Sequence, residues 1–381
     1  MGERDRLGLL SSHPVIRLAW VVDGDLDQLS GGYLYDRIVV GDLRRHGVEV
    51  EVLSLPTGPY GLRLLQGAPP AIEQSLLSSP FDIVVQDELS HPALIRLNRR
   101  LAQEAPGLQR VALVHHLRAS EPRPWPARLL YRQIEISYLR SVDSFIFNSR
   151  TTRAVVQALV GSSRPSIVAL PGADRLGPAL KPHTVEQRAG EPGPLRILFV
   201  ANVIPRKGLH TLVEALARLP RGMTTLTIAG NDRLEPAYTR RVSGAIQRFR
   251  LDDEVTFVGL LERDTLAEAM ESHHVLAVPS SYEGYGMAYL EGMGRGLPAI
   301  AGSDGGPREF VRDDQNGYLV RAGDPGDLAA KLQSLATDRQ RLARLSLSAL
   351  ETYRNHPTWS DTGASVLRFV QGLPRRARAS V

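Results

Sequence analysis

The sequence contains no cysteine and almost no lysine. Because cysteine is absent from all 381 residues, disulfides, thiolate metal ligands and cysteine nucleophiles are excluded. Lysine occurs only at Lys181, Lys207 and Lys331, so nearly all of the 46 basic residues are arginine. These arginines are dispersed along the chain and leave a formal net charge of only +5. Without a basic cluster or a recognisable nucleic-acid motif, we expect no nucleic-acid partner.

Long apolar runs and dinucleotide motifs are lacking as well. No segment approaches the ~20 apolar residues that a membrane-spanning helix needs. Residues 1–20 also lack the order of basic, apolar and small residues that marks a signal peptide. No G-x-G-x-x-G follows an apolar run, which argues against a NAD-dependent oxidoreductase. We expect a cytoplasmic protein, with peripheral contact at the inner face of the membrane as a further option.

Short apolar, β-branched runs alternate with segments of helical period, which is typical of parallel α/β proteins. At roughly 100 to 200 residues per domain, the length predicts two domains. The predicted strands are residues 15–22, 48–55, 82–86, 110–114, 143–147 and 166–170, and then 195–201, 224–230, 255–259, 274–279, 298–302 and 317–320. The polar stretch 181–194, rich in Gly and Pro, reads as a linker. Two Rossmann-like domains facing across a cleft are therefore expected, with ligands at the carboxyl ends of the strands.

The segment "SYEGYGMAYLEGMGRGLP", residues 281–298, follows one of these strands. Gly284 and Gly286 would let the backbone approach a ligand closely. The next helix is predicted to begin between Tyr285 and Met287. Its first N–H groups lack intrahelical partners and carry partial positive charge, which makes a ready phosphate site.

Two glutamates flank this predicted helix start. At ~100° per residue, Glu291 falls on the apolar face of the helix, where a carboxylate needs a hydrogen-bonding partner. It lies roughly 6 to 9 Å along the helix from its start, so ribose hydroxyls suit it. The alternative is a buried ion pair with an arginine. Glu283, in the loop before the helix, would lie nearer the sugar end of the same ligand, or would be a solvated turn acid.

The segment "FVANVIPRKGLH", residues 199–210, places Arg206 and Lys207 at the start of another helix. Two cations oppose the helix dipole there unless they share an anion such as a diphosphate. An exposed basic turn is the alternative. Asn202 follows the predicted strand 195–201 and Gly230 ends the predicted strand 224–230, and we expect both to contact the same ligand.

Together these segments resemble the retaining GT-B glycosyltransferases of sequence family 4, the glycosyl transferases group 1. The resemblance rests on "RKG", "AGND", "VTFVG", "SSYEGYGMAYLEGMGRGLPAIAGSDGGPREFV" and "NGYLV", in that order, over residues 195–320. It implies hexosyl transfer from a nucleoside diphosphate sugar to a lipid, saccharide or small-molecule acceptor. By the same resemblance Glu291 would hold the ribose, Glu283 the sugar, and Arg206 with Lys207 the diphosphate leaving group.

The resemblance also implies how the chain is divided. Residues 1–180 would form the acceptor-side domain and residues 195–355 the donor-side domain. A last helix within residues 356–381 would cross back to the N-terminal domain. Two rival functions stay open on this fold: a nucleotide-sugar epimerase or hydrolase, and a non-catalytic nucleotide-sugar-binding protein.

The N-terminal half carries weaker signals. Gly31 and Gly32 follow the first strand and would approach donor or acceptor. His115 follows a strand end and is the histidine that the resemblance places near the donor sugar, although a one-residue slip would favour His116, and a purely structural histidine is the alternative.

The acidic run "DGDLD", residues 23–27, has the D-x-D spacing that holds Mg²⁺ or Mn²⁺ in another glycosyltransferase fold. Because Arg206 and Lys207 could supply the positive charge instead, we expect no metal requirement and no cofactor besides the donor. Residues 123–140 mix aromatic residues and arginines in a predicted helix. Such a helix could lie on a membrane, but an ordinary surface helix is favoured.

Overall fold

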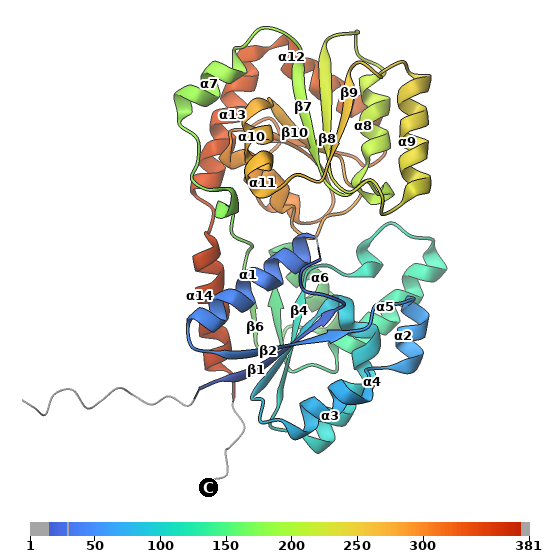
Figure 1. Cartoon of the computed structure of the whole chain (residues 1–381), viewed down its shortest axis with the longest axis vertical. Coiled ribbons are helices and arrows are strands. Elements are labelled where there is room, and N and C mark those ends of the chain that lie inside the picture. Colours follow the sequence, from blue (N-terminus) through green and yellow to red (C-terminus); the bar gives the residue numbers. More distant parts are fainter. Residues whose placement is uncertain (1–14, 29, 375–381) are drawn as a thin grey trace, which may run out of the picture.

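The computed structural model describes residues 15–28 and 30–374, which form two α/β halves stacked along the long axis (Figure 1). Each half is built on a six-stranded sheet in which all neighbouring strands are parallel. All the predicted strands are present, with ends within two residues of the predicted ones. The predicted α/β fold of two Rossmann-like domains is confirmed. The predicted domain ends at residues 1 and 381 lie outside the described ranges.

The N-terminal half has the strand order β2-β1-β3-β4-β5-β6. Its strands are β1 (Arg17–Asp23), β2 (Glu49–Leu55), β3 (Ile83–Asp87), β4 (Gln109–Val114), β5 (Ser144–Phe147) and β6 (Ser166–Val168). Its helices are α1 (Gly31–Arg45), α2 (Tyr60–Gln66), α3 (Pro70–Ser78), α4 (His91–Glu104), α5 (Trp125–Leu139) and α6 (Arg150–Val160).

The C-terminal half has the order β12-β11-β10-β7-β8-β9. Its strands are β7 (Leu195–Val200), β8 (Thr224–Ala229), β9 (Val255–Gly259), β10 (Val275–Val278), β11 (Ala299–Gly302) and β12 (Gly317–Val320). Its helices are α7 (Pro182–Ala189), α8 (Leu209–Leu216), α9 (Pro236–Arg248), α10 (Arg263–Ser272), α11 (Met287–Gly294), α12 (Pro325–Thr337) and α13 (Arg339–Arg354).

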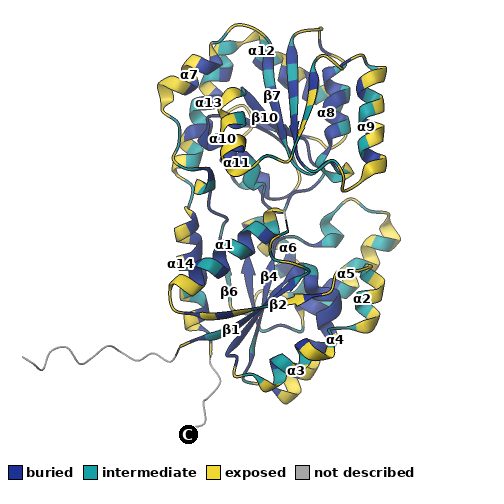
Figure 2. Cartoon of the chain, viewed as in Figure 1, coloured by how far each residue is buried: buried dark blue, intermediate teal, exposed yellow. Residues whose placement is uncertain are grey.

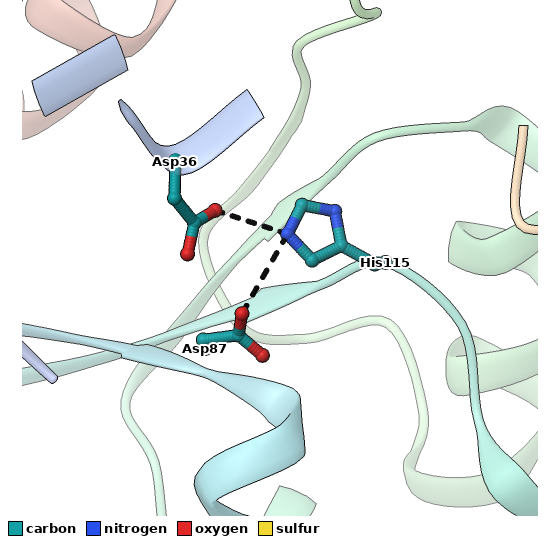
Figure 3. Close-up of side chains that lie close together, drawn as sticks. All are labelled: Asp36, Asp87 and His115. Carbon is teal, nitrogen blue, oxygen red and sulfur yellow. Dashed lines mark hydrogen bonds and ion pairs between the residues drawn. The ribbon is translucent and has the colours of Figure 1, made fainter. Parts of the chain in front are cut away.

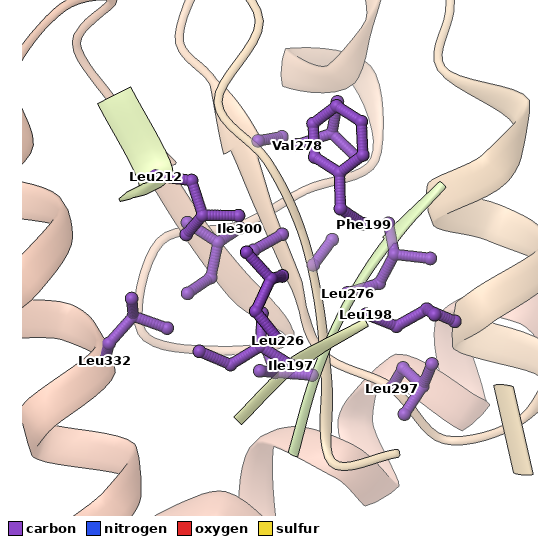
Figure 4. Packing of buried hydrophobic residues seen from close by; sticks show 14 of the residues in the cluster. Ile197, Leu198, Phe199, Leu212, Leu226, Leu276, Val278, Leu297, Ile300 and Leu332 are labelled. Carbon is purple, nitrogen blue, oxygen red and sulfur yellow. The ribbon is translucent and has the colours of Figure 1, made fainter. Parts of the chain in front are cut away.

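The strands read as continuous apolar runs because helices cover both faces of each sheet. Figure 2 shows the central strands buried and the outer helix faces exposed. In the C-terminal half, Leu198 and Leu276 pack beside Leu297, while Leu212 and Leu332 come from the surrounding helices (Figure 4). Rigid sheets of this kind fix the loops at their carboxyl ends.

The predicted linker 181–194 is wrong in part, because residues 182–189 form helix α7. Pro182 occupies its first turn, where a missing N–H does no harm. Val185 and Ala189 are buried, and Arg188 donates hydrogen bonds to the carbonyls of Arg295 and Gly296 at 2.7 and 3.0 Å. These contacts hold the short helix in place although its flanks are rich in Gly and Pro.

The last helix, α14 (Trp359–Gly372), lies beside α1 of the N-terminal half (Figure 1). Its start carries a capping box formed by Thr358 and Asp361. The backbone N–H of Trp359 also donates to Asp174 at 2.8 Å, in the segment that joins the halves. Within residues 15–28 and 30–374, no helix is both long and apolar enough to cross a membrane.

Candidate active site

A cavity of about 420 Å³ lies between the two halves, at the carboxyl ends of both sheets. Every predicted catalytic and donor-binding residue lines it. From the N-terminal half these are Gly31, Gly32 and His115, and from the C-terminal half Asn202, Arg206, Lys207, Gly230, Glu283, Gly284, Tyr285, Gly286, Met287 and Glu291. His116 lines the same cavity. The fold thus brings together residues that are far apart in the sequence.

Glycine allows the two halves to approach each other at this cavity. A Cβ atom on Gly31 would lie 2.9 Å from the methyl carbon of Met287, and one on Gly284 would lie 2.6 Å from the carbonyl oxygen of His115. Gly286 takes a positive φ of 98° and caps α11, which begins at Met287 as predicted. The free N–H groups of this helix start lie at the cavity.

Glu283 is 8% exposed and accepts hydrogen bonds from Lys207 Nζ at 2.5 Å and from the Ser280 hydroxyl at 2.7 Å. The solvated-turn alternative for this acid is therefore wrong. Burial raises the pKa of Glu283, but Lys207 and Arg206 outweigh it and lower the pKa overall. Burial lowers the pKa of Lys207, and Glu283 opposes that shift. The pair joins a buried acid to a half-buried lysine at the cavity wall.

Arg206 connects the two halves. Its Nη1 donates to the carbonyl of Tyr282 at 2.8 Å, and its Nε lies 3.6 Å from Glu121 Oε1 of the N-terminal half. The same Glu121 oxygen lies 3.1 Å from His116 Nε2. Burial raises the pKa of Glu121, but His116 and Arg206 outweigh it and lower the pKa to about 2. Glu121 therefore provides a negative charge beside Arg206, at a place where the diphosphate of a ligand could provide it instead.

Glu291 forms a bidentate ion pair with Arg175. The guanidinium Nε lies 2.6 Å from Oε1 and Nη2 lies 3.0 Å from Oε2, and Glu291 is 6% exposed. In this structure Glu291 therefore makes the buried ion pair with an arginine that was the alternative to a ribose contact. Arg175 belongs to the short 3₁₀ turn at Asp174–Leu176, which leads from the N-terminal half toward α7. Both residues line the cavity, so the carboxylate stays within reach of a ligand.

Two further glycines of α11 allow tight packing behind Glu291. A Cβ on Gly292 would lie 3.2 Å from the Leu276 side chain, and one on Gly294 would lie 2.6 Å from the Tyr353 ring. Glycine in a helix weakens it by ~1 kcal/mol relative to alanine. Here the loss allows β10 and α13 to approach α11 closely.

The two candidate histidines differ in their surroundings. His115 is buried, and its Nε2 lies 3.0 Å from Asp36 Oδ1 and 4.0 Å from Asp87 Oδ2. His116 is half-buried and faces Glu121. A Cβ on Gly32 would lie 3.3 Å from the His115 ring, so the first turn of α1 covers this histidine directly.

The three aspartates of the D-x-D run do not converge on a common point. Asp23 lies 2.7 Å from Arg63, Asp27 lies 3.5 Å from Arg37, and Asp25 accepts the backbone N–H of Asp27 at 2.9 Å. Each aspartate has its own partner, and the Asp23 partner lies 40 positions away in the chain.

Comparison with known proteins decides the family. Residues 184–351 match the glycosyl transferases group 1 family, and residues 22–173 match the glycosyl transferase 4-like domain. The chain belongs to the glycosyltransferases of sequence family 4. This glycosyltransferase moves a sugar from a nucleoside diphosphate sugar to an acceptor, and membership of the family implies retention at the anomeric carbon.

Relatives match this glycosyltransferase over most of its length. The D-inositol 3-phosphate glycosyltransferase of Nocardia farcinica is 25% identical over 407 residues, spanning 95% of this chain and 88% of the relative. The glycogen synthase of Mycobacterium tuberculosis is 26% identical over 273 residues, 70% of this chain and 64% of the relative.

Solved structures share the two-domain fold. Sucrose-phosphate synthase from Thermosynechococcus elongatus superimposes with a TM-score of 0.79 at 22% identity, covering 93% of this chain and 98% of that one. Anabaena HepE in complex with UDP-glucose gives a TM-score of 0.74 at 19% identity, covering 94% and 100%. At these identities the likeness shows the GT-B fold of the glycosyltransferase.

Several charged residues at or near the cavity of this glycosyltransferase were not predicted. Arg37, Glu88 and Arg175 line the cavity, and Asp36, Asp87 and Glu121 contact residues that line it. Asp87 directly follows the predicted strand 82–86 and is the last residue of β3, so the rule that ligands lie at strand ends could have found it. Arg175 meets Glu291 across 116 positions in the chain, and no local pattern signals such a contact.

Proposed function

We propose that the cavity binds a uridine diphosphate sugar and that leaving-group stabilisation drives the retaining transfer. The observation that carries this proposal is the convergence of Arg206, Lys207, the α11 N-terminus and Glu291 on one cavity. The structures of HepE with UDP and UDP-glucose support the choice of uracil as the nucleobase of the donor.

The roles follow from charge and position. Arg206 and Lys207, with the N–H groups at the start of α11, would hold the diphosphate and stabilise the charge that develops on it. Glu291 would accept hydrogen bonds from the ribose hydroxyls, and Glu283 would contact the donor sugar. We place His115 beside that sugar, with Gly31 and Gly32 forming the wall opposite α11.

Tyr285, Gly286 and Met287, with Gly284, would line the phosphate end of the donor, while Asn202 and Gly230 would line its nucleoside side. Glu283 is held by Lys207 and Ser280 and is ill placed to act as a free nucleophile. The acceptor would therefore attack from the face of the departing diphosphate, which can take the acceptor proton. No metal is assigned a part in this scheme.

The same proposal divides the chain into functional units. Residues 1–180 would form the acceptor side and residues 195–355 the donor side. The helix α14, within residues 356–381, would tie the two together. Closure of these units over the donor would exclude water and align the acceptor.

A peripheral membrane contact through residues 123–140 is part of the proposal. Trp125 is 69% exposed and Leu130 is 62% exposed on α5, and Leu65 on the neighbouring helix α2 is 69% exposed. Tyr60 of α2 and Tyr131 of α5 pack ring against ring at 4.8 Å, which keeps the two helices together. Exposed arginines on α5 would meet anionic headgroups while the apolar residues enter the interface.

A thermal-shift titration with UDP, GDP, ADP and NAD, each with and without EDTA, tests the donor assignment. We expect the melting temperature to rise with UDP and the rise to survive EDTA. A rise with NAD alone, or with none of the four, would remove the basis of the proposal.

Product analysis with UDP-glucose tests the reaction. We expect donor consumption to depend on an added acceptor. Donor turnover without an acceptor would favour the epimerase or hydrolase, and donor binding without turnover in a broad acceptor panel would favour a binding protein.

A further inference from the structure

Three buried acids surround His115 beneath the first turn of α1 in the N-terminal half. Asp36 of α1 and Asp87 at the end of β3 both face the Nε2 of His115 (Figure 3). Glu88 accepts the backbone N–H of His115 at 2.6 Å. The described side chains of all three acids are buried, and the donor contacts proposed above use none of them.

The two aspartates are satisfied to different degrees. Asp36 accepts from His115 on one oxygen and from Trp20 Nε1 at 3.3 Å on the other. Asp87 accepts the backbone N–H of Leu89 on Oδ1, whereas its Oδ2 has no hydrogen-bond partner among the residues described. Burial and the charge of Asp36 raise the pKa of Asp87 well above its usual range. Two carboxyl groups therefore face the same nitrogen of the ring, and they are held by different partners.

The ring itself is held at one nitrogen and free at the other. Figure 3 shows Nδ1 on the edge of the ring away from both carboxylates. His115 lines the cavity, and no hydrogen bond from Nδ1 is found in the described parts of the chain. Burial lowers the pKa of His115, but Asp36, Asp87 and Glu88 together outweigh it and raise the pKa to about 9.

We propose that Asp36 and Asp87 are positioning residues that hold His115 as an imidazolium and aim its Nδ1–H into the cavity. An imidazolium donates from both nitrogens and accepts from neither. With Nε2–H committed to Asp36, Nδ1–H is left to bind an oxygen of the donor sugar. This last step rests on the proposed function, because the oxygen belongs to the proposed donor.

Other groups that face His115 do not replace these acids. The Tyr35 ring meets the imidazole edge-on at 5.3 Å, and the Thr152 hydroxyl donates to the His115 carbonyl at 3.2 Å. Neighbouring His116 is directed to Glu121, and the C-terminal half approaches through the uncharged backbone of Gly284. The charge of the ring is therefore set from α1 and from the β3 end.

A divalent cation is the competing occupant of this cluster. The ligand atoms of Asp36, Asp87 and His115 lie within 4.8 Å of one another, and carboxylate and imidazole ligands suit several divalent ions. Such an ion would keep the imidazole neutral and bound through Nε2. The proposal requires a proton on Nε2 of His115, whereas a bound cation requires that nitrogen to carry none.

Nitrogen NMR of the ligand-free full chain, labelled with ¹⁵N-histidine, separates them. The His115 signal is assigned by its loss in the His115→Gln variant. We expect both ring nitrogens to be protonated at pH 7 and to titrate near pH 9. A neutral ring at pH 7 would overturn the proposal, as would a His115 signal that responds to EDTA and returns with Mn²⁺ or Zn²⁺.

Asp36→Asn is the decisive variant, because the amide oxygen can still accept from Nε2–H while the charge is gone. We expect the titration of His115 to move down by more than one pH unit in Asp36→Asn. Asp87→Asn should lower the titration pH of His115 by a smaller amount. The same variant provides the test if Asp36→Asn does not fold. The matched control is Asp42→Asn. Asp42 is a second buried aspartate of α1, its partners are Arg45 and His46, and its replacement should leave the His115 signal unchanged.

Transfer kinetics supply a second readout. In Asp36→Asn the alkaline limb of the kcat profile should move to lower pH, by the same interval as the NMR titration. An unmoved alkaline limb would show that the acids serve only the fold. Because the NMR experiment needs no donor, failure of UDP to bind would overturn the proposed function without deciding the protonation of His115.

Discussion

The two walls of the cavity handle buried charge in different ways. On the C-terminal wall each acid meets a base: Glu283 pairs with Lys207, and Glu291 pairs with Arg175 of the segment that joins the two halves. Near the N-terminal wall, Asp36 and Asp87 both face the His115 ring, and Glu88 accepts the backbone N–H groups of His115 and His116. An anionic ligand can share or exchange partners in the first arrangement. In the N-terminal arrangement the acids outnumber the bases, and we expect their charge to keep the His115 ring protonated.

The largest expected effect comes from removing the cations of the C-terminal wall. Lys207→Ala should lower kcat by roughly 10² to 10³, the loss found when one donor to a developing charge is removed. Arg206→Ala should act in the same direction. Steady-state kinetics with saturating donor measure this. Lys331→Ala removes another lysine, paired with Asp313 in the described structure, and should leave kcat unchanged.

An effect on KM alone in Lys207→Ala or Arg206→Ala would contradict leaving-group stabilisation. It would mean that these cations hold ground state and transition state equally well.

Glu291→Gln should come next. The ribose contact and the ion pair with Arg175 both weaken, so the Kd for UDP should rise roughly ten- to a hundredfold, or about 1.4 to 2.8 kcal/mol. Calorimetric titration measures this, and circular dichroism checks that the variant folds. Arg175→Met is the matched variant, because it removes the ion pair with Glu291 but keeps the Glu291 carboxylate. Unchanged UDP affinity in Glu291→Gln would rule out the ribose assignment.

The pH dependence of stability sharpens the contrast with the N-terminal wall. The pKa of His115 is raised from 6.5 to about 9 in the folded chain. The stabilisation from its protonation is therefore fully present below pH 6.5 and is lost as the pH rises to about 9. Its size should be of the order of 3 kcal/mol.

Denaturant unfolding of wild type and Asp36→Asn across this pH range measures how the free energy of unfolding depends on the protonation of His115. The decline between pH 6.5 and 9 should be weaker in Asp36→Asn. Equal slopes in the two proteins would place the titration elsewhere in the chain.

The smallest effect should follow from Glu121→Gln, which touches both walls. Its carboxylate lies 3.6 Å from Arg206, and both side chains are partly exposed. Loss of this competing anion should tighten UDP binding by about two- to fivefold, in line with the ~0.2 to 1 kcal/mol of exposed ion pairs. Weaker UDP binding would show that Glu121 supports Arg206 and does not compete for it.

Much of the fold was readable because each signal was local. Buried parallel strands gave continuous apolar runs, and the period of α11 placed Glu291 on its apolar face before any contact was known. Helix α7 was missed because flanking Gly and Pro concealed a short helix held by Val185 and Arg188. Arg175 and Asp36 were missed because their partners lie far away along the chain.

The difference in affinity between UDP and uridine tests most directly how the C-terminal wall uses its charges. If Arg206 and Lys207 hold the diphosphate, UDP should bind wild type at least a hundredfold tighter than uridine does, which is about 2.8 kcal/mol. In the Arg206→Ala, Lys207→Ala double variant that difference should shrink to less than tenfold, with uridine affinity unchanged. A difference that persists in the double variant would contradict the account.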